Sequence, residues 1–244
     1  MSEDKKDIHN SEVPALCRSC EARHRGICGA LNGEQLSKLN RVANRKEFSA
    51  GTELVGDSEE FQTYSNVLSG VVKLTKTMMD GREQIVGLQF APDFLGRPFH
   101  KESHVSAEAA STVQLCMFPK SSIEAMLKES ADLKQRMLEQ TLTELDEARD
   151  WMLTLGRKTA GEKVASFVYM IAKHIDPEAD KNEQQDVSFD LPLTRADMAD
   201  YLGLTIETVS RQLTKLRKSG VVEIEHNRHF RIPNMSRLGR YSGV

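Results

Sequence analysis

The stretch Leu193–Ile232, LTRADMADYLGLTIETVSRQLTKLRKSGVVEIEHNRHFRI, decides the fold of the C-terminal part of the chain. Thr194 is of a residue type that caps helices, so a first helix is expected to begin there. That helix stops at Gly203, because glycine frees the backbone for a tight turn. A second helix starts at Thr205 and ends at Gly220. Two helices around a short glycine turn are typical of a helix-turn-helix.

The residues after the second helix complete this pattern. Val221–Ile224 and His229–Ile232 are expected to form a hairpin, which is the wing of a winged helix. From Thr194 to the end the chain has nine Lys and Arg against five Asp and Glu, a net charge of +4 in a protein of net charge −3. A basic end on an acidic body favours nucleic acid as the partner.

The second helix carries side chains suited to reading DNA bases. A stripe of apolar residues at helical spacing is expected to be buried: Val209, Leu213 and Leu216. The outward face near the N-terminal end then carries Glu207, Ser210 and Arg211. Arginine can donate two hydrogen bonds to guanine, glutamate can accept one from cytosine, and serine can bond either neighbour. The other polar residues are candidates for phosphate contacts, namely Thr208, Lys215, Arg217 and Lys218.

The middle of the 244-residue chain has a pattern typical of β-strands and not of helices. From Arg45 to Pro119, short β-branched runs alternate with turns, which suggests an antiparallel roll or barrel. The clearest strands are expected at three places: Asn66–Thr75, Gln84–Phe90 and Thr112–Phe118. The dipeptide Asp80-Gly81 between two such runs indicates a hairpin.

A long helical stretch is expected from about Ser122 to Gly156. Small and apolar residues recur along it at coiled-coil spacing: Leu138, Thr141, Leu145, Ala148, Met152 and Leu155. This seam predicts pairing with a partner helix. An amphipathic helix packed on its own domain is the alternative.

Four cysteines are the most unusual feature of the chain. Cys17, Cys20 and Cys28 form a C-x2-C-x7-C run, and Cys116 lies in an expected strand. The polar start of the chain, read as a mobile tail over residues 1–16, has no signal peptide, and no apolar run is long enough for a membrane span. The protein is therefore expected in the cytoplasm, where thiols stay reduced. Reduced clustered thiols point to a metal or redox cofactor, with free thiols as the alternative.

Together, these features resemble the FNR branch of the CRP/FNR transcription regulators over nearly the whole chain. The match includes ETVSRQL at 207–213, the β-rich region, the long helix and the cysteine set. The resemblance implies an α+β fold with an N-terminal antiparallel β-roll like a cyclic-nucleotide-binding jelly roll, a long dimerisation helix and a C-terminal winged helix-turn-helix. It divides the chain into a cysteine segment (1–30), a β-roll sensor domain (31–125), a dimerisation helix (126–157) and a DNA-binding domain (158–244).

The resemblance also implies a function. Glu207, Ser210 and Arg211 match the E-x-x-S-R triplet that reads palindromic DNA with TTGAT-like half-sites. The four cysteines match the ligands of an oxygen-labile [4Fe-4S] cluster that promotes homodimerisation and DNA binding at low oxygen. Turns of the β-roll, including Asp80-Gly81, are expected to contact RNA polymerase. Seven residues separate the second and third cysteines, whereas the enterobacterial members have five and related alphaproteobacterial regulators have this longer loop.

Other cofactors and functions fit the sequence less well. Zinc is the main rival for the four thiols, but structural zinc sites usually use two close pairs of ligands. Basic residues lie between the ligands and could balance the negative charge of a cluster, with a solvated position as the equal alternative: Arg18, Arg23, His24 and Arg25. The arginine pattern that binds a cyclic nucleotide is absent from Asp93–Gly96 and Ser103–Ala110. Haem remains an alternative cofactor, because His100 and His104 are available as ligands. No catalytic constellation is present, so an enzyme is not expected; an iron–sulfur electron carrier remains a rival.

Overall fold

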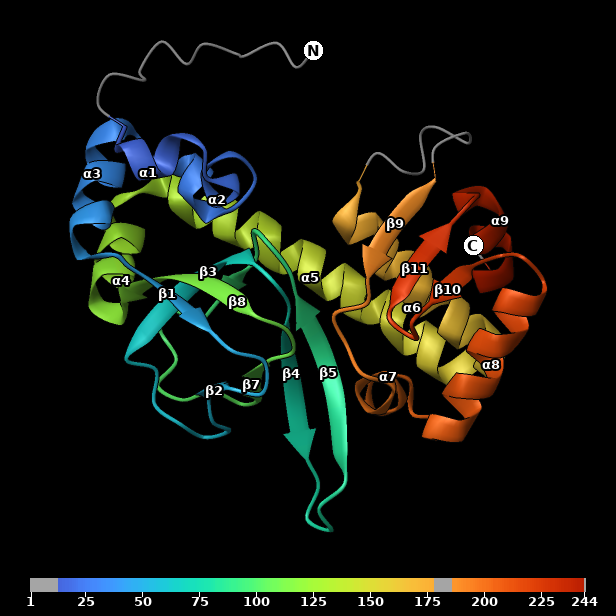
Figure 1. Ribbon diagram of the computed structural model, residues 1–244. Helices are drawn as coiled ribbons and strands as arrows, with labels where there is room; N and C mark the ends of the chain where they lie inside the picture. The colour runs from blue at the N-terminus through green and yellow to red at the C-terminus, as the bar shows by residue number, and fades with distance from the viewer. Residues whose placement is uncertain (1–12, 178–185, 244) are drawn as a thin grey trace. The chain divides into compact units, whose positions relative to one another are not determined.

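The computed structural model describes residues 13–177 and 186–243 (Figure 1). They form two compact units, one of residues 13–76 and 86–144, the other of residues 77–85, 145–177 and 186–243. Most of the tail expected at residues 1–16 lies outside the described residues. Within the described ranges, no helix is long and apolar enough to cross a membrane.

The cysteine segment folds as three short helical turns, followed by a longer helix. The turns are α1 (Ala15–Arg18), α2 (Glu21–His24) and the 3-10 turn η1 (Ile27–Ala30). Helix α3 (Gly33–Val42) begins at a capping box, in which Asn32 accepts a hydrogen bond from the Gln35 backbone and Gln35 accepts one from the Asn32 backbone. These reciprocal bonds satisfy N–H groups that have no partner inside the helix.

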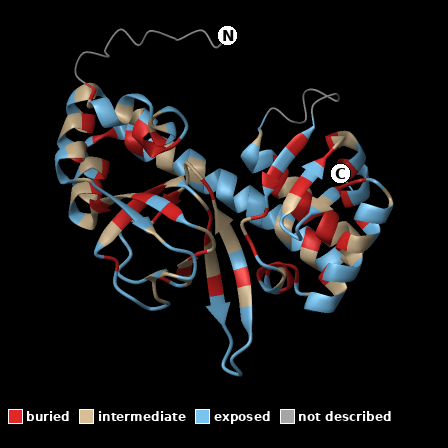
Figure 2. Cartoon of the chain, in the orientation of Figure 1, coloured by how far each residue is buried: buried red, intermediate tan, exposed pale blue. Residues whose placement is uncertain are grey.

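The β-rich region forms two four-stranded sheets of a β-roll, with strand orders β1-β8-β3-β6 and β2-β7-β4-β5. The strands are β1 (Asn44–Phe48), β2 (Glu53–Val55), β3 (Thr63–Ser69), β4 (Val72–Thr77), β5 (Glu83–Gln89), β6 (Phe94–Leu95), β7 (Ser106–Ala109) and β8 (Val113–Pro119). In β7 the buried residues alternate, at Ala107 and Ala109, whereas β3 buries four consecutive residues, 64–67; the buried parts of the strands are red in Figure 2. The two sheets therefore enclose an apolar interior, with Val67, Val72 and Leu115 at its centre.

The run expected over Asn66–Thr75 is divided between the two sheets. Strand β3 ends at Ser69 and β4 begins at Val72, so the chain changes sheets at Gly70. Gly70 has a φ of +82°, and a Cβ there would lie 2.2 Å from the carbonyl oxygen of Thr112. Only glycine fits this crossing without displacing β8.

The helical stretch expected over Ser122–Gly156 is helical in the structure, but it is divided into two helices, a break that was not predicted. They are α4 (Lys120–Glu129) and α5 (Ala131–Arg157), separated by Ser130 in an extended conformation. The backbone N–H of Ser130 donates to Met126 and its hydroxyl accepts from the backbone of Leu133. Serine thus ends one helix and caps the next, since its side chain competes for backbone hydrogen bonds.

The second unit contains the winged helix. Its elements are the second half of α5, α6 (Ala160–Ile175), β9 (Val187–Asp190), α7 (Arg195–Leu202), α8 (Ile206–Lys218), β10 (Glu223–Glu225), β11 (His229–Ile232) and α9 (Met235–Ser242). Strands β10, β11 and β9 form an antiparallel sheet. Three residues, 226–228, connect the wing strands; the Arg228 N–H donates to the Glu225 carbonyl, and the two central residues of this turn, His226 and Asn227, have positive φ. The α+β fold predicted from the sequence is confirmed.

Candidate functional site

The helix-turn-helix is built from local signals. Thr194 caps α7 in a capping box with Asp197, and Gly203 ends that helix in the left-handed conformation at a φ of +61°. Thr205 then caps α8 by accepting a hydrogen bond from the Thr208 backbone. Two capped ends joined by a glycine turn set the angle between the two helices.

Helix α8 presents the expected outward face. Its apolar stripe is buried, as predicted: Val209, Leu213 and Leu216. Glu207, Ser210 and Arg211 are exposed together near the N-terminal end of α8. Hydrogen bonds from the backbone and from Thr205 hold the pKa of Glu207 below its usual value, so it stays a charged acceptor. The candidate phosphate contacts Lys215, Arg217 and Lys218 are exposed as well, and Thr208 is half-buried.

A polar hollow of about 290 Å³ lies between α8 and the wing. Its lining includes the predicted DNA contacts Ser210 and Arg217, and two residues that the sequence analysis missed, Arg195 and Asn227. Arg195 donates to the backbone oxygen of Asn227 at 3.0 Å and lies over the ring of Phe230. It therefore fastens the wing turn beside α8. The two residues are 32 positions apart in the sequence, so no local sequence pattern predicts their contact.

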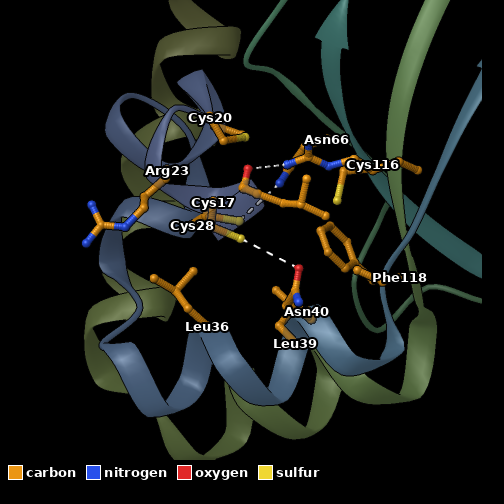
Figure 3. Close-up of a pocket in the computed structure, with 14 residues that line it drawn as sticks. Cys17, Cys20, Arg23, Cys28, Leu36, Leu39, Asn40, Asn66, Cys116 and Phe118 are labelled. Carbon is orange, nitrogen blue, oxygen red and sulfur yellow. Dashed lines mark hydrogen bonds between the residues drawn. The ribbon is translucent and has the colours of Figure 1, made fainter. Parts of the chain in front are cut away.

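The four cysteines line one cavity of about 170 Å³ (Figure 3). Cys17 lies on α1, Cys20 caps α2, Cys28 lies in η1 and Cys116 lies in the middle of β8. Strand β8 places Cys116 between Arg45 of β1 and Asn66 of β3 in the sheet register. A cavity of about 150 Å³ can hold benzene, so this one is large enough for a compact inorganic group.

Amide and arginine side chains surround the sulfur atoms. The buried Asn66 donates from Nδ2 to Sγ of Cys28 at 3.2 Å, and Sγ of Cys17 donates to Oδ1 of Asn40 at 3.9 Å. Arg45 hydrogen-bonds the Cys116 thiol. Asn66 and Arg45 were not predicted as part of this site, because the strand pairing that places them is long-range.

The basic residues between the ligands are less well placed than expected. Arg23 lines the cavity, but its guanidinium points away from the sulfur atoms in Figure 3. Arg18, His24 and Arg25 are exposed and are not among the lining residues. Arg45 lies beside the thiols and opposes the rise in the pKa of both Cys17 and Cys116, and Arg23 opposes it at Cys17 to a smaller extent.

Burial sets the protonation of the thiols. It raises the pKa of Cys28 to about 12 and that of Cys116 to about 11, and neighbouring thiols add to the rise. The Asn66 amide opposes it at Cys28, and Arg45 opposes it at Cys116. Metal binding must therefore displace protons. In the ranges that the structure describes, no three His, Cys, Asp or Glu side chains are grouped so that they could hold a metal ion.

The chemistry of the lining nevertheless fits an iron–sulfur group. Four soft sulfur donors face one cavity, and all four are free. An amide donor and an arginine beside the sulfurs suit a site of net negative charge. His100 and His104, considered for haem, lie near each other in the loop before β7, and neither lines this cavity.

The seam of α5 is open to solvent in this single chain. Leu138, Leu145 and Met152 are exposed by 60%, 42% and 68%; Thr141 and Ala148 are exposed too, and Leu155 is half-buried. Leu142 and Leu153, which strict seven-residue spacing left out, are exposed by 51% and 58%. The alternative was that this face packs on its own domain, but most of these side chains are exposed in the single chain.

Comparisons with known proteins agree with the fold. A model of the Crp-like helix-turn-helix domain matches residues 162–241, and a model of the cyclic nucleotide-binding domain matches residues 45–130. A "Probable transcriptional activator" of Rhizobium leguminosarum bv. viciae is 50% identical over 98% of both chains. The transcriptional activator protein FnrL of Cereibacter sphaeroides is 40% identical over 95% of both. The solved structure of FixK2 from Bradyrhizobium japonicum superposes with a TM-score of 0.74 at 30% identity, over 83% of this chain and 98% of that one.

The fold and the exposed face of α8 thus define a winged-helix transcription regulator joined to a β-roll. Relatives of this similarity are regulators and not enzymes, as the sequence predicted. The chain belongs to the CRP/FNR family of transcription regulators, and it is a DNA-binding activator of the FNR and FixK type.

Proposed function

We propose that this protein is an oxygen-responsive, homodimeric activator whose sensor is a [4Fe-4S] cluster held by Cys17, Cys20, Cys28 and Cys116. The observation that carries the proposal is the common cavity of the four thiols. Three of them come from one short segment and the fourth from a strand 88 positions later than Cys28. The regulator acts in the cytoplasm, beside the DNA.

The residues of this chain have defined tasks in the proposal. The four thiols would hold the group as thiolates, after losing their protons, while Asn66 and Arg45 would supply a hydrogen bond and a positive charge to the sulfurs. When bound, a [4Fe-4S] cluster supplies the sensitivity to oxygen, because oxygen converts or destroys it. Its ligation ties the cysteine segment to β8, and loss of that tie shifts the pairing equilibrium of α5 toward the monomer.

The homodimer is supported by the exposed face of α5. Five large apolar side chains are exposed on this helix: Leu138, Leu142, Leu145, Met152 and Leu153. An apolar stripe of this length is typical of an interface. A two-fold pair places two copies of α8 about one DNA turn apart, in successive major grooves.

DNA recognition divides between bases and phosphates. Glu207, Ser210 and Arg211 read the half-site, in the proposal a TTGAT-like sequence in a palindrome. Near the C-terminal end of α8, the exposed side chains of Lys215, Arg217 and Lys218 contact phosphates. Thr208, nearer the N-terminal end, contacts a phosphate as well. At the β4–β5 turn, Met78 and Met79 are exposed beside Asp80-Gly81 and offer a contact for RNA polymerase.

The deciding experiment is purification without oxygen, followed by iron and sulfide analysis and a visible spectrum before and after air. The proposal expects a brown protein with about four iron and four sulfide per chain, and loss of colour together with loss of dimer in air. Zinc without sulfide would support a zinc-stabilised regulator of another signal. A cluster in a protein that binds no specific DNA would favour an electron carrier.

A further inference from the structure

Helix α5 hydrogen-bonds the cysteine segment through Arg136. Nη2 of Arg136 donates to the backbone oxygen of Arg25, and Nε donates to that of Gly26 at 3.4 Å. Both carbonyls belong to the seven residues between Cys20 and Cys28. The contact spans 110 positions of sequence, and it meets the cysteine loop at the turn between α2 and η1.

This turn is held in place on its other sides. Gly26 is buried, and a Cβ on it would lie 2.9 Å from the backbone oxygen of Pro92 and 3.0 Å from that of Ala22. The oxygen of Gly26 also accepts from the backbone N–H of Gly29, which closes η1 around Cys28. A shift of Cys28 therefore moves the carbonyls that Arg136 binds, because little free space surrounds them.

An apolar contact accompanies the arginine. Leu133, one turn before Arg136, is fully buried in the same core cluster as Ile27 and Cys28, and Met137 packs against that cluster. Leu138 follows at once and is the first residue of the exposed face of α5. The first turns of α5 are thus fixed by the cysteine segment, at the point where the pairing face begins.

We propose that Arg136 is a positioning residue that couples the cysteine site to the pairing face of α5. It binds the Arg25–Gly26 turn with its guanidinium and sets the position of the helical turn that carries Leu138. Ligation of Cys20 and Cys28 fixes the turn, and Arg136 passes this constraint to the helix. The inference rests on the proposed function, since it names the residue through which the cluster affects dimerisation.

The test compares three variants of the full chain. Arg136→Met keeps the aliphatic stem and removes every donor, whereas Arg136→Lys keeps the charge and a donor. Glu139→Gln is the matched control, because Glu139 is exposed and its ion pair with Arg136, at 3.8 Å, lies within α5. Each protein is prepared with the cluster and without it, in the absence of oxygen.

The first measurement is hydrogen exchange of the backbone in the cluster-free proteins. In Arg136→Met, amides of residues 21–29 should exchange about tenfold faster, the effect of losing a hydrogen bond from a charged donor. Glu139→Gln should match the wild type, and Arg136→Lys should fall between. Unchanged exchange in Arg136→Met would overturn the claim that Arg136 holds the turn, whether or not a cluster is ever bound.

The second measurement is the ratio of the dimer dissociation constants without and with the cluster, from sedimentation equilibrium. Arg136→Met should reduce this ratio about tenfold, within the usual range of coupling between sites, and Glu139→Gln should keep it. A purely structural role would weaken both dimers alike and leave the ratio unchanged, which overturns the inference. If Arg136→Met takes up no cluster, the ratio of dimer dissociation constants is measured for Arg136→Lys, and a ratio equal to that of the wild type overturns the inference. A wild-type ratio of one would instead contradict the proposed function.

Discussion

Leu138→Ala tests the pairing face of α5 directly. The side chain is 60% exposed in the single chain. Full burial of a leucine side chain stabilises by about 1.5–3 kcal/mol, so covering the exposed part contributes about 1–2 kcal/mol in each protomer. A two-fold dimer contains the residue twice, which gives about 2–4 kcal/mol. Since alanine retains part of this, a loss of about 2 kcal/mol is expected, or about 30-fold in the dimer dissociation constant.

Sedimentation equilibrium of cluster-loaded protein without oxygen measures this constant. Val42→Ala is a suitable control, because Val42 is also exposed, by 45%, but lies on α3. The control should dimerise as the wild type does. The thermal midpoint of dilute cluster-free protein should change little in both variants, since exposed side chains contribute little to folding. Wild-type dimerisation of Leu138→Ala would refute the reasoning that this face pairs.

Three further predictions concern the DNA interface, the cysteine site and the stability of the winged helix. Arg211→Ala should cost about 1–3 kcal/mol of DNA binding and relax specificity at one base pair in competition assays; a uniform loss on all sequences would make Arg211 a phosphate contact. Cys116→Ser should lower the iron and sulfide content of anaerobically purified protein, because a hydroxyl is a poor ligand for iron–sulfur clusters, whereas full iron content would remove Cys116 from the ligands. Asp197→Ala removes the hydrogen bonds that Thr194 donates to it and should lower the free energy of unfolding in urea by about 1–2 kcal/mol; an unchanged midpoint would show that the capping box is not needed.

The winged helix was predictable because its signals are local. The capping threonines, the glycine turn and the apolar stripe of α8 act within a few residues, and each lies where the sequence indicated. The break at Ser130 also had a local signal, a serine able to cap α5, but the helical periodicity on both sides concealed it. Periodicity reports which face of a helix is apolar and does not report a single extended residue.

The surroundings of the thiols could not be predicted in the same way. Asn66 and Arg45 reach the cysteines only through the pairing of β8 with β3 and β1, and Arg136 reaches the loop across 110 positions. Such contacts depend on register and on tertiary packing, which composition and spacing do not encode. Leu142 and Leu153 were missed for a different reason. A strict heptad follows a narrow stripe, whereas the exposed apolar face of α5 is wider.

The position of Cys116 in a middle strand of a sheet bears on how the protein is made. Cys28 leaves the ribosome 88 residues before Cys116, which at about 5–20 residues per second is about 4 to 18 s. During that interval three thiols are already synthesised, while the strand that carries the fourth, and the neighbours that bury it, do not yet exist. In the proposed site, all four ligands can therefore be present only after Cys116 has been synthesised. In a cell growing in air, the nascent thiols depend for those seconds on the reducing power of the cytoplasm.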